Sequence, residues 1–494
     1  MESTERGACV GAGNAVGFRA VTVPATPALV VDLDGTLIAT DLLHEAALLL
    51  GKHHPLELLR LPWWLAQGKE RVKAELAERV LPEVALLPYR VEVLEFVRAE
   101  RAAGRAVVLA TASPRRFAEA VAAQLGLFDA VLATDATTNL VGAAKLAAIR
   151  AHLGAAPFEY LGDSAADFAV WAEAAVCHVV EPSRTMEERL VASGKMGRVF
   201  VREDPPPWPL LRALRPQQWT KNLLLFVPAA LAHQLDAWPW LLLAWAAFSL
   251  CASGVYVLND LLDLEADRNH PRKRGRPFAA GVLPVRRGLL LAIALPAGAA
   301  LAASFLPWAF AAWLALYLAA TLAYSAWLKR KPAVDVIVLA GLYTLRLLAG
   351  ASVAEVDVST WLLAFGMFFF LSLAFVKRFT ELLPLTDAPE KWLPGRGYVG
   401  ADLEIIRVVG PVSGYLAVLV LAFYIDSDKV RSLYAAPARL WLECPALLYW
   451  ITRLWFFAQR RALHDDPVVF ALTDPESWLV AAWMVGVAVW AAHG

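Results

Sequence analysis

The sequence predicts two parts of different fold class: an α/β domain with a parallel sheet, followed by an all-α region that crosses a membrane about nine times. Three observations predict this division. Apolar residues make up 59% of the 494 residues, yet the long apolar runs begin only near residue 222. Before that point, short β-rich runs alternate with helical segments. Many of the 19 tryptophans lie near the ends of the apolar runs, as they do at membrane interfaces.

In the first part, helical segments separate short runs of strand-forming residues, which indicates a parallel sheet. These runs are 29–33, 105–111, 130–134, 158–163 and 177–180. Residues 41 to about 100 are predicted to be helical, with prolines that start or break the helices. Ligands of such sheets bind at the carboxyl ends of the strands. The polar residues of this part fall at those ends.

Candidate catalytic residues follow the predicted strands in order. They are Asp32 and Asp34 in D-L-D-G-T, Thr111, Lys145, and Asp163 and Asp167 in G-D-S-A-A-D. Asp32 can attack phosphorus, and Asp34 can protonate the leaving alcohol and then activate water. Thr111 and Lys145 can hold the phosphoryl oxygens. Asp163, with Asp32 and the carbonyl of Asp34, can bind Mg²⁺, which lets one anion approach another.

This order and spacing resemble the haloacid dehalogenase (HAD) phosphatase superfamily over about residues 27–200. The resemblance implies a Rossmann-like core, Mg²⁺ and hydrolysis of a phosphomonoester. It also implies a helical cap at about 40–90, between the first and second motifs. The alternatives are a chance turn at D-L-D-G-T and a degenerate domain without activity. The presence of all four motifs in order favours the catalytic interpretation.

The composition of the whole chain limits the kinds of partner and metal site that we expect. The formal net charge is zero, so no overall field favours nucleic acid, and we expect none as a partner. The cysteines (Cys9, Cys177, Cys251 and Cys444) form no C-x-x-C pair, which indicates packing residues and no zinc site or disulfide frame. The first 20 residues lack the apolar stretch of a signal peptide. We therefore expect 1–26 to be a flexible tail and the N-terminal domain to stay in the cytoplasm.

A proline-rich linker is expected at 201–210, and a membrane domain at 211–494. The predicted spans are 223–235, 241–258, 288–306, 308–326, 333–350, 360–376, 408–425, 437–457 and 477–492. With the N-terminal domain inside, the inside loops hold nearly all lysines and arginines of this part, as the positive-inside rule requires. The protein is therefore predicted to lie in the inner (cytoplasmic) membrane.

Three carboxylates follow the second apolar run. Asp260, Asp263 and Asp267 have the spacing i, i+3, i+7, which places them on one face of a helix. Carboxylates beside a bilayer are costly unless a cation joins them. We expect Mg²⁺ holding a diphosphate to be that cation. The basic run 272–276 follows; on its own, such a run would indicate a loop that sets membrane topology.

Further polar residues are expected to line the same pocket and bind substrate. They are Lys221, Asn222, Asn259, Lys273, Arg276, Tyr324, Lys329, Asp335 and Arg346. Arg346 lies about three turns inside an apolar span, so it needs a buried partner or a water-filled cavity. A purely structural role is the alternative for this arginine.

The pattern N-D-x-x-D-x-x-x-D followed by R-P resembles the UbiA-type intramembrane prenyltransferase superfamily over about 210–494. The usual second motif of that superfamily has paired aspartates, whereas this chain has Y-S-x-x-L-K followed by the single Asp335. The segments 215–222, 265–277 and 461–474 resemble the decaprenyl-phosphate phosphoribosyltransferase branch. That branch implies a polyprenyl phosphate acceptor and a phosphoribosyl diphosphate donor.

A phosphoribosylated lipid carries a 5-phosphate that a HAD phosphatase can remove. The two resemblances together therefore indicate a bifunctional enzyme with Mg²⁺ in both domains. One alternative is a prenyltransferase that acts on an aromatic or glycerol-phosphate acceptor. The other is a noncatalytic membrane scaffold with a vestigial HAD domain.

Overall fold

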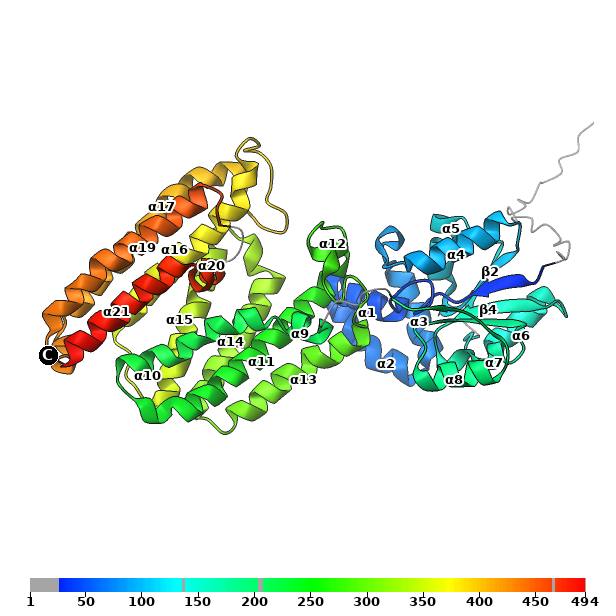
Figure 1. Cartoon of the computed structure of the whole chain (residues 1–494), viewed down its shortest axis with the longest axis horizontal. Coiled ribbons are helices and arrows are strands. Elements are labelled where there is room, and N and C mark those ends of the chain that lie inside the picture. The colour runs from blue at the N-terminus through cyan, green and yellow to red at the C-terminus, as the bar shows by residue number, and fades with distance from the viewer. Residues whose placement is uncertain (1–25, 136–137, 203–207, 464–466, 494) are drawn as a thin grey trace, which may run out of the picture. The chain divides into compact units, whose positions relative to one another are not determined.

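The structure is a computed structural model that describes residues 26–493, except 136–137, 203–207 and 464–466. Nearly all of the expected tail 1–26 and the middle of the expected linker 201–210 lie outside the described residues. The chain divides into two compact units, Met1–Pro205 and Pro206–Gly494. Each unit is described by itself (Figure 1).

A six-stranded parallel sheet forms the centre of the first unit, in the order β3-β2-β1-β4-β5-β6. The strands are β1 (Ala28–Val31), β2 (Val107–Pro114), β3 (Ala130–Thr134), β4 (Phe158–Gly162), β5 (Val176–Val180) and β6 (Met196–Phe200). The five predicted strands are thus confirmed. Strand β6 was not predicted, because this edge strand has the sequence M-G-R-V-F and no buried residue that would give an apolar run.

Helices cover both faces of this sheet. Val31 and Leu109 pack against α4 (Val91–Ala102) and α5 (Arg115–Leu125). On the other face, Val30 and Val108 pack against α6 (Ala143–Leu153), α7 (Phe168–Trp171) and α8 (Arg184–Ala192). This division follows from the alternation of side chains along a strand. The first unit is therefore the predicted α/β domain.

The segment between β1 and α4 is helical, as predicted. It contains α1 (Leu42–His53), η1 (Pro55–Arg60), α2 (Leu61–Ala66), α3 (Lys69–Arg79) and η2 (Val84–Leu86). Leu42, Leu50, Trp64 and Leu76 of this segment are buried in the same cluster as one face of the sheet. The helical segment therefore packs as part of the α/β domain.

The second unit is helical. Its α-helices are α9 (Pro209–Leu214), α10 (Val227–Leu231), α11 (Trp238–Leu262), α12 (Leu264–Arg268), α13 (Val285–Ala303), α14 (Trp308–Ala326), α15 (Val334–Ala354), α16 (Thr360–Leu382), α17 (Leu403–Ile425), α18 (Asp428–Leu433), α19 (Glu443–Gln459), α20 (Pro467–Thr473) and α21 (Pro475–His493). Short 3-10 turns include η4 (Pro216–Phe226), η6 (Lys273–Gly275), η7 (Leu328–Arg330) and η10 (Pro437–Leu442).

Within the described residues, seven of these helices are long and apolar enough to span a membrane. They are α11, α13, α14, α15, α16, α17 and α21. The chain is therefore an integral membrane protein. The other two of the nine predicted spans, 223–235 and 437–457, do not form a helix of this length, each for a structural reason.

The predicted span 223–235 is not one helix, because η4 occupies Pro216–Phe226 and α10 holds only five residues. The predicted span 437–457 begins with the turn η10 and continues as α19, which has 17 residues. At about 1.5 Å per residue, α19 is about 26 Å long, slightly short of a hydrocarbon core of about 30 Å.

Candidate active sites

Asp32 and Asp34 lie at the carboxyl end of β1, in the middle of the sheet. Asp32 directly follows β1, and its Oδ1 accepts a hydrogen bond of 2.8 Å from the backbone N–H of Leu33. Gly35 has φ +76°, and a Cβ at this position would lie 2.2 Å from Oδ2 of Asp163. Only glycine allows this left-handed turn and this close approach. The D-G pair therefore brings β1 and the loop after β4 together.

Lys145 contacts two of the predicted residues, Asp32 and Asp167, and also Tyr160. Its Nζ lies 2.7 Å from Oδ2 of Asp32, 3.1 Å from Oδ1 of Asp167 and 2.8 Å from the hydroxyl of Tyr160. Burial opposes a charge on Lys145, but Asp32 and Asp167 outweigh it and raise the pKa of the ammonium group. Lys145 is therefore a fixed cation beside the proposed nucleophile.

Asp34 is held at a second position in the same site. Its Oδ2 accepts a hydrogen bond of 2.5 Å from Oγ of Ser113, and its Oδ1 accepts one of 2.9 Å from the N–H of Leu42. Burial, and then the charge of Asp41, raises the pKa of Asp34 to about 8. A carboxyl group with such a pKa can donate a proton near neutral pH.

Thr111 lies on β2 beside these groups, and it is fully buried. Its Oγ1 accepts a hydrogen bond of 3.0 Å from the N–H of Ser113. The structure therefore brings all of the sequence-predicted HAD residues to one end of the sheet. It adds Ser113 and Tyr160, which the sequence analysis did not single out.

Three carboxylates of this site could hold a cation. Each of Asp32, Asp163 and Asp167 offers an oxygen atom, and these atoms lie within 4.8 Å of one another. Oδ2 of Asp167 accepts hydrogen bonds from Ser164, and its Oδ1 accepts from Lys145 and Tyr160. Burial and the charge of Asp32 raise the pKa of Asp163 to about 7. A site of oxygen ligands with excess negative charge fits Mg²⁺.

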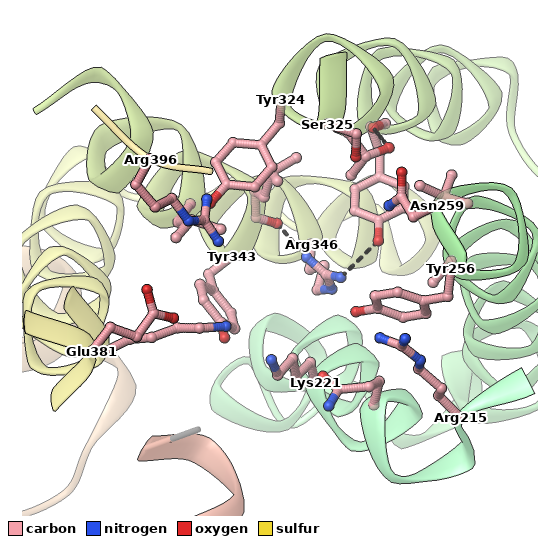
Figure 2. A pocket seen from close by; sticks show the side chains of 18 of the residues that line it. Arg215, Lys221, Tyr256, Asn259, Tyr324, Ser325, Tyr343, Arg346, Glu381 and Arg396 are labelled. Carbon is pink, nitrogen blue, oxygen red and sulfur yellow. Dashed lines mark hydrogen bonds between the residues drawn. The ribbon is translucent and has the colours of Figure 1, made fainter. Parts of the chain in front are cut away.

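In the second unit, a cavity of about 580 Å³ lies among α11, α14, α15, α16 and η4. Figure 2 shows Arg346 near its centre, with Lys221 and Arg215 on one side and Glu381 and Arg396 on another. The cationic side chains that line it are Arg215, Lys221, Arg276, Arg346, Lys377 and Arg396. Among the described lining residues, Glu381 is the one carboxylate. Cationic side chains therefore outnumber carboxylates in the described lining of this cavity.

Arg346 is buried in α15 and makes its hydrogen bonds to neutral groups. Its Nε donates to Oδ1 of Asn222 at 2.8 Å, and Nη1 and Nη2 donate to the carbonyl of Leu342 and the hydroxyl of Tyr317 at 2.6 and 3.1 Å. Neutral acceptors satisfy the donors of a guanidinium and leave its charge in place. An anion in the cavity would therefore gain directly from Arg346.

The binding of Mg²⁺ by Asp260, Asp263 and Asp267 stays a prediction, and in this structure Asp260 and Asp267 pair with arginines. Helix α11 ends at Leu262, so the three do not share one continuous helix. Arg276 Nη1 lies 2.9 Å from Asp260 and 2.6 Å from Asp267, and Arg215 lies 2.5 Å from Asp260. Across the described part of the second unit, no three metal-ligating side chains converge. Arg215 and Arg276 thus lie beside two of the carboxylates that are expected to bind the ion.

Asp335 has a different role from the one expected. It is fully buried, and its carboxylate accepts hydrogen bonds of 2.5 Å from both Arg378 and the hydroxyl of Tyr398. It does not line the cavity. Lys273 is exposed in η6, Lys329 is half-buried in η7, and neither is among the described lining residues. The expectation that these three line the pocket was wrong.

The other expected residues lie in or next to the cavity. Lys221, Asn259, Arg276, Tyr324 and Arg346 line it, and Asn222 lies behind Arg346. The sequence analysis missed Arg215, Lys377, Glu381 and Arg396. Arg215 is the first residue of the segment R-P-Q-Q-W-T-K-N, which supports the family resemblance. Its position in that segment could have identified it as a candidate binding residue.

Two family matches agree with the two units. Residues 62–171 match the haloacid dehalogenase-like hydrolase family, and residues 223–382 match the UbiA prenyltransferase family. A protein of Sinorhizobium fredii, named "Uncharacterized protein y4nM", is 36% identical over 462 residues; the match covers 92% of this chain and 89% of that protein. This relative therefore has both parts.

A second relative matches only part of the chain. The decaprenyl-phosphate phosphoribosyltransferase of Corynebacterium glutamicum is 38% identical over 183 residues, which cover 35% of this chain and 54% of that protein. This match falls in the UbiA part. A solved UbiA homolog from Archaeoglobus fulgidus, bound to DMAPP and Mg²⁺, has a TM-score of 0.44 and 17% identity, covering 57% of this chain and 98% of that one. The assignment of the family rests on the sequence matches.

Proposed function

Because the chain belongs, with y4nM, to a family that joins a haloacid dehalogenase-like hydrolase domain to a UbiA prenyltransferase domain, we propose that it catalyses two consecutive reactions. The membrane domain transfers 5-phosphoribose from phosphoribosyl diphosphate to a polyprenyl phosphate. The HAD domain then hydrolyses the 5-phosphate of the product. The similarity to the Corynebacterium phosphoribosyltransferase supports the choice of substrates.

The positive charge of the cavity is the observation that best supports the proposed transfer of phosphoribose. Its described lining residues include six cationic side chains and one carboxylate, and Asp260 and Asp267 offset part of the charge of Arg215 and Arg276. Transfer between these substrates brings together a diphosphate, a 5-phosphate and a lipid phosphate, and each phosphate group carries at least one negative charge. A prenyl transfer to a neutral aromatic acceptor brings only one diphosphate. The excess of cations fits the larger negative charge better.

The first reaction breaks the bond between the anomeric carbon and the diphosphate oxygen, and it forms a bond from that carbon to an oxygen of the lipid phosphate. The diphosphate leaves with the bonding electrons, so positive charge develops on the ribose. Arg276, Arg215 and Arg346 neutralise the anions and hold them in place. The lipid phosphate is already ionised, so its attack requires no general base.

The second reaction uses the HAD residues. Asp32 attacks the phosphorus of the 5-phosphate and forms an aspartyl-phosphate, while the bond to the sugar oxygen breaks and Asp34 gives its proton to that oxygen. Asp34 then accepts a proton from water, which attacks the aspartyl-phosphate, releases inorganic phosphate and restores Asp32. Lys145 and Thr111 hold the phosphoryl oxygens. Asp32 and Asp163, together with the carbonyl of Asp34, would hold Mg²⁺, which when bound neutralises charge between the nucleophile and the phosphate. We place this domain in the cytoplasm, on the side of the lysine- and arginine-rich loops.

The decisive experiment follows the lipid by mass. Purified full-length protein is incubated with a polyprenyl phosphate, phosphoribosyl diphosphate and Mg²⁺. The wild type is expected to yield polyprenyl phosphoribose without a 5-phosphate. An Asp32→Asn variant is expected to accumulate the lipid that still carries this phosphate. A Glu187→Gln variant, changed at an exposed carboxylate of α8, serves as the matched control.

Two results would contradict the proposal. If Asp32→Asn and the wild type give the same end product, the HAD domain does not act on the lipid. If the protein instead transfers the prenyl group of geranyl diphosphate to an aromatic or glycerol-phosphate acceptor, the membrane domain is a prenyltransferase. Absence of turnover with every donor would indicate a scaffold.

A further inference from the structure

Glu381 is an unusual side chain for a cavity that binds anions. It lies near the end of α16, and its side chain is 33% exposed within a lining that contains six cations. In Figure 2 it lies on the opposite side of Arg346 from Arg215. A carboxylate repels the phosphates for which the rest of the cavity is suited. Arg378 offsets part of this charge, and the exposed part of Glu381 suits a group that donates hydrogen bonds better than it suits a phosphate.

Glu381 is hydrogen-bonded to a network of buried side chains that is centred on Arg378. Arg378 is fully buried and donates to Oε2 of Glu381, and it also donates to Asp335 at 2.5 Å. The third contact of Arg378 is the hydroxyl of Tyr324 at 3.0 Å. Asp335 therefore fixes Arg378, and Arg378 fixes Glu381 at the cavity wall.

The network leaves Glu381 with capacity to accept hydrogen bonds. A carboxylate has about four lone-pair sites, and the contact with Arg378 uses Oε2. Groups that donate to a carboxylate are ammonium, guanidinium, amide and hydroxyl. The proposed donor carries two neighbouring hydroxyls, on carbons 2 and 3 of its ribose. A prenyl diphosphate carries none.

We propose that Glu381 recognises the sugar of the donor by accepting hydrogen bonds from the ribose 2- and 3-hydroxyls. Six cations hold the phosphates, and this one carboxylate selects a polyhydroxylated carbon skeleton between them. Carboxylates fix ribose hydroxyls in the same manner in dinucleotide-binding sites. Glu381 is thus a specificity-determining residue, while Asp335 and Arg378 position it. This inference rests on the proposed function, because it assumes a ribosyl donor.

The test uses competition by sugar phosphates on the full-length protein in detergent. Ribose 5-phosphate and 2-deoxyribose 5-phosphate compete against labelled phosphoribosyl diphosphate, and inorganic diphosphate serves as the probe without a sugar. In the wild type, ribose 5-phosphate is expected to compete about 10- to 100-fold better than the deoxy sugar, the range for hydrogen bonds to a charged acceptor. This part of the test needs no variant that could misfold.

The Glu381→Gln variant then assigns the difference to this side chain. We expect it to reduce the preference for ribose 5-phosphate by at least 10-fold and to leave the affinity for inorganic diphosphate within a factor of about three. The matched control is Glu404→Gln, an exposed carboxylate in the first turn of α17. A merely structural role of Glu381 would weaken all probes together.

Failure of the inference and failure of the proposed function give different results. If the wild type binds phosphoribosyl diphosphate but does not distinguish the two sugar phosphates, Glu381 does not recognise the hydroxyls. Equal loss of every probe in Glu381→Gln leads to the same conclusion. If the wild type instead prefers geranyl diphosphate over phosphoribosyl diphosphate, the proposed donor itself is wrong.

Discussion

The guanidinium of Arg276 lies 2.6 Å from Oδ2 of Asp267, in the place where the sequence predicts a metal ion. The same nitrogen lies 2.9 Å from Oδ1 of Asp260. The two carboxylates are buried, so each must be neutralised by a nearby cation. Arg276 also lines the cavity, so its guanidinium has room to contact a phosphate while it stays paired with the two carboxylates. We therefore expect Asp260 and Asp267 to orient Arg276 toward a phosphate of the substrate.

Arg276→Ala is expected to raise the KM for the diphosphate donor by about 10- to 100-fold, because it removes a charge-assisted contact to the phosphate. It also leaves Asp260 and Asp267 with less positive charge nearby. The assay is transfer to polyprenyl phosphate over a range of donor concentrations. Arg274→Ala is the control, since Arg274 is exposed two residues away. Equal KM values for both variants would remove Arg276 from the binding site.

η4 packs closely against α15, and Gly350 of α15 makes this close contact possible. Substitution of this glycine tests whether the position of η4 matters for transfer. A Cβ at Gly350 would lie 1.9 Å from the carbonyl oxygen of Leu225, a backbone atom that cannot move alone. η4 also carries Lys221 and Asn222 to the cavity. Gly350→Ala is therefore expected to displace η4 and to reduce transfer at least 10-fold.

Gly341→Ala is the control for that substitution. Gly341 lies on the same helix, and a Cβ at this position has nothing within 4 Å. Alanine favours a helix over glycine by up to about 1 kcal/mol, so this variant is expected to be as stable as the wild type or more stable. For both variants, the thermal stability in detergent and the rate of transfer are measured. If Gly341→Ala and Gly350→Ala lose similar amounts of transfer activity, the loss does not come from the contact between Gly350 and Leu225.

The HAD site was predictable from the sequence because its residues stand at the ends of strands. Asp32, Thr111 and Asp163 each follow or end an apolar β-run, and parallel strands bring such ends to one edge. The short motifs also include the glycine that the turn needs. Ser113 was missed because a serine two residues after Thr111 has no periodicity or motif of its own.

The membrane cavity was predictable only in part. Asn259, Arg276 and Tyr324 belong to recognisable segments, whereas Lys377, Glu381 and Arg396 come from α16 and the loop after it. Their convergence depends on helix packing, which local sequence does not encode. The spacing of Asp260 and Asp267 predicted one helix face, but it could not reveal that α11 ends between them or that Arg276 returns to pair with both.

Mg²⁺ is expected to protect the HAD domain. Asp32 and Asp163 present carboxylate oxygens that a bound cation would join. A ligand at 100 times its Kd stabilises the state that binds it by about 2.7 kcal/mol. Amide hydrogen exchange of the full-length protein, with and without Mg²⁺, measures the protection of peptides from β1 and β4 by the ion. Protection is expected in the wild type and in Glu187→Gln.

Asp163→Asn is the variant that tests the assignment. It removes one charge from the cation site but keeps the size of the side chain, so the protection by Mg²⁺ is expected to be largely lost. The hydrogen bond from Thr36 to Oδ1 of Asp163, 3.1 Å long, can still form in this variant. If Asp163→Asn retains full protection, the metal is bound elsewhere.

The pair Asp335–Arg378 provides a test of positioning against bulk stability, since both side chains are fully buried. Removal of one partner leaves a buried charge, which costs about 3–5 kcal/mol. Asp335→Asn and Arg378→Gln are therefore each expected to lower the thermal stability in detergent clearly. The double variant removes both charges, so its loss is expected to be smaller than the sum of the two single losses. If the losses add, the two residues act independently, and Asp335 cannot be the anchor that fixes Arg378 and, through it, Glu381.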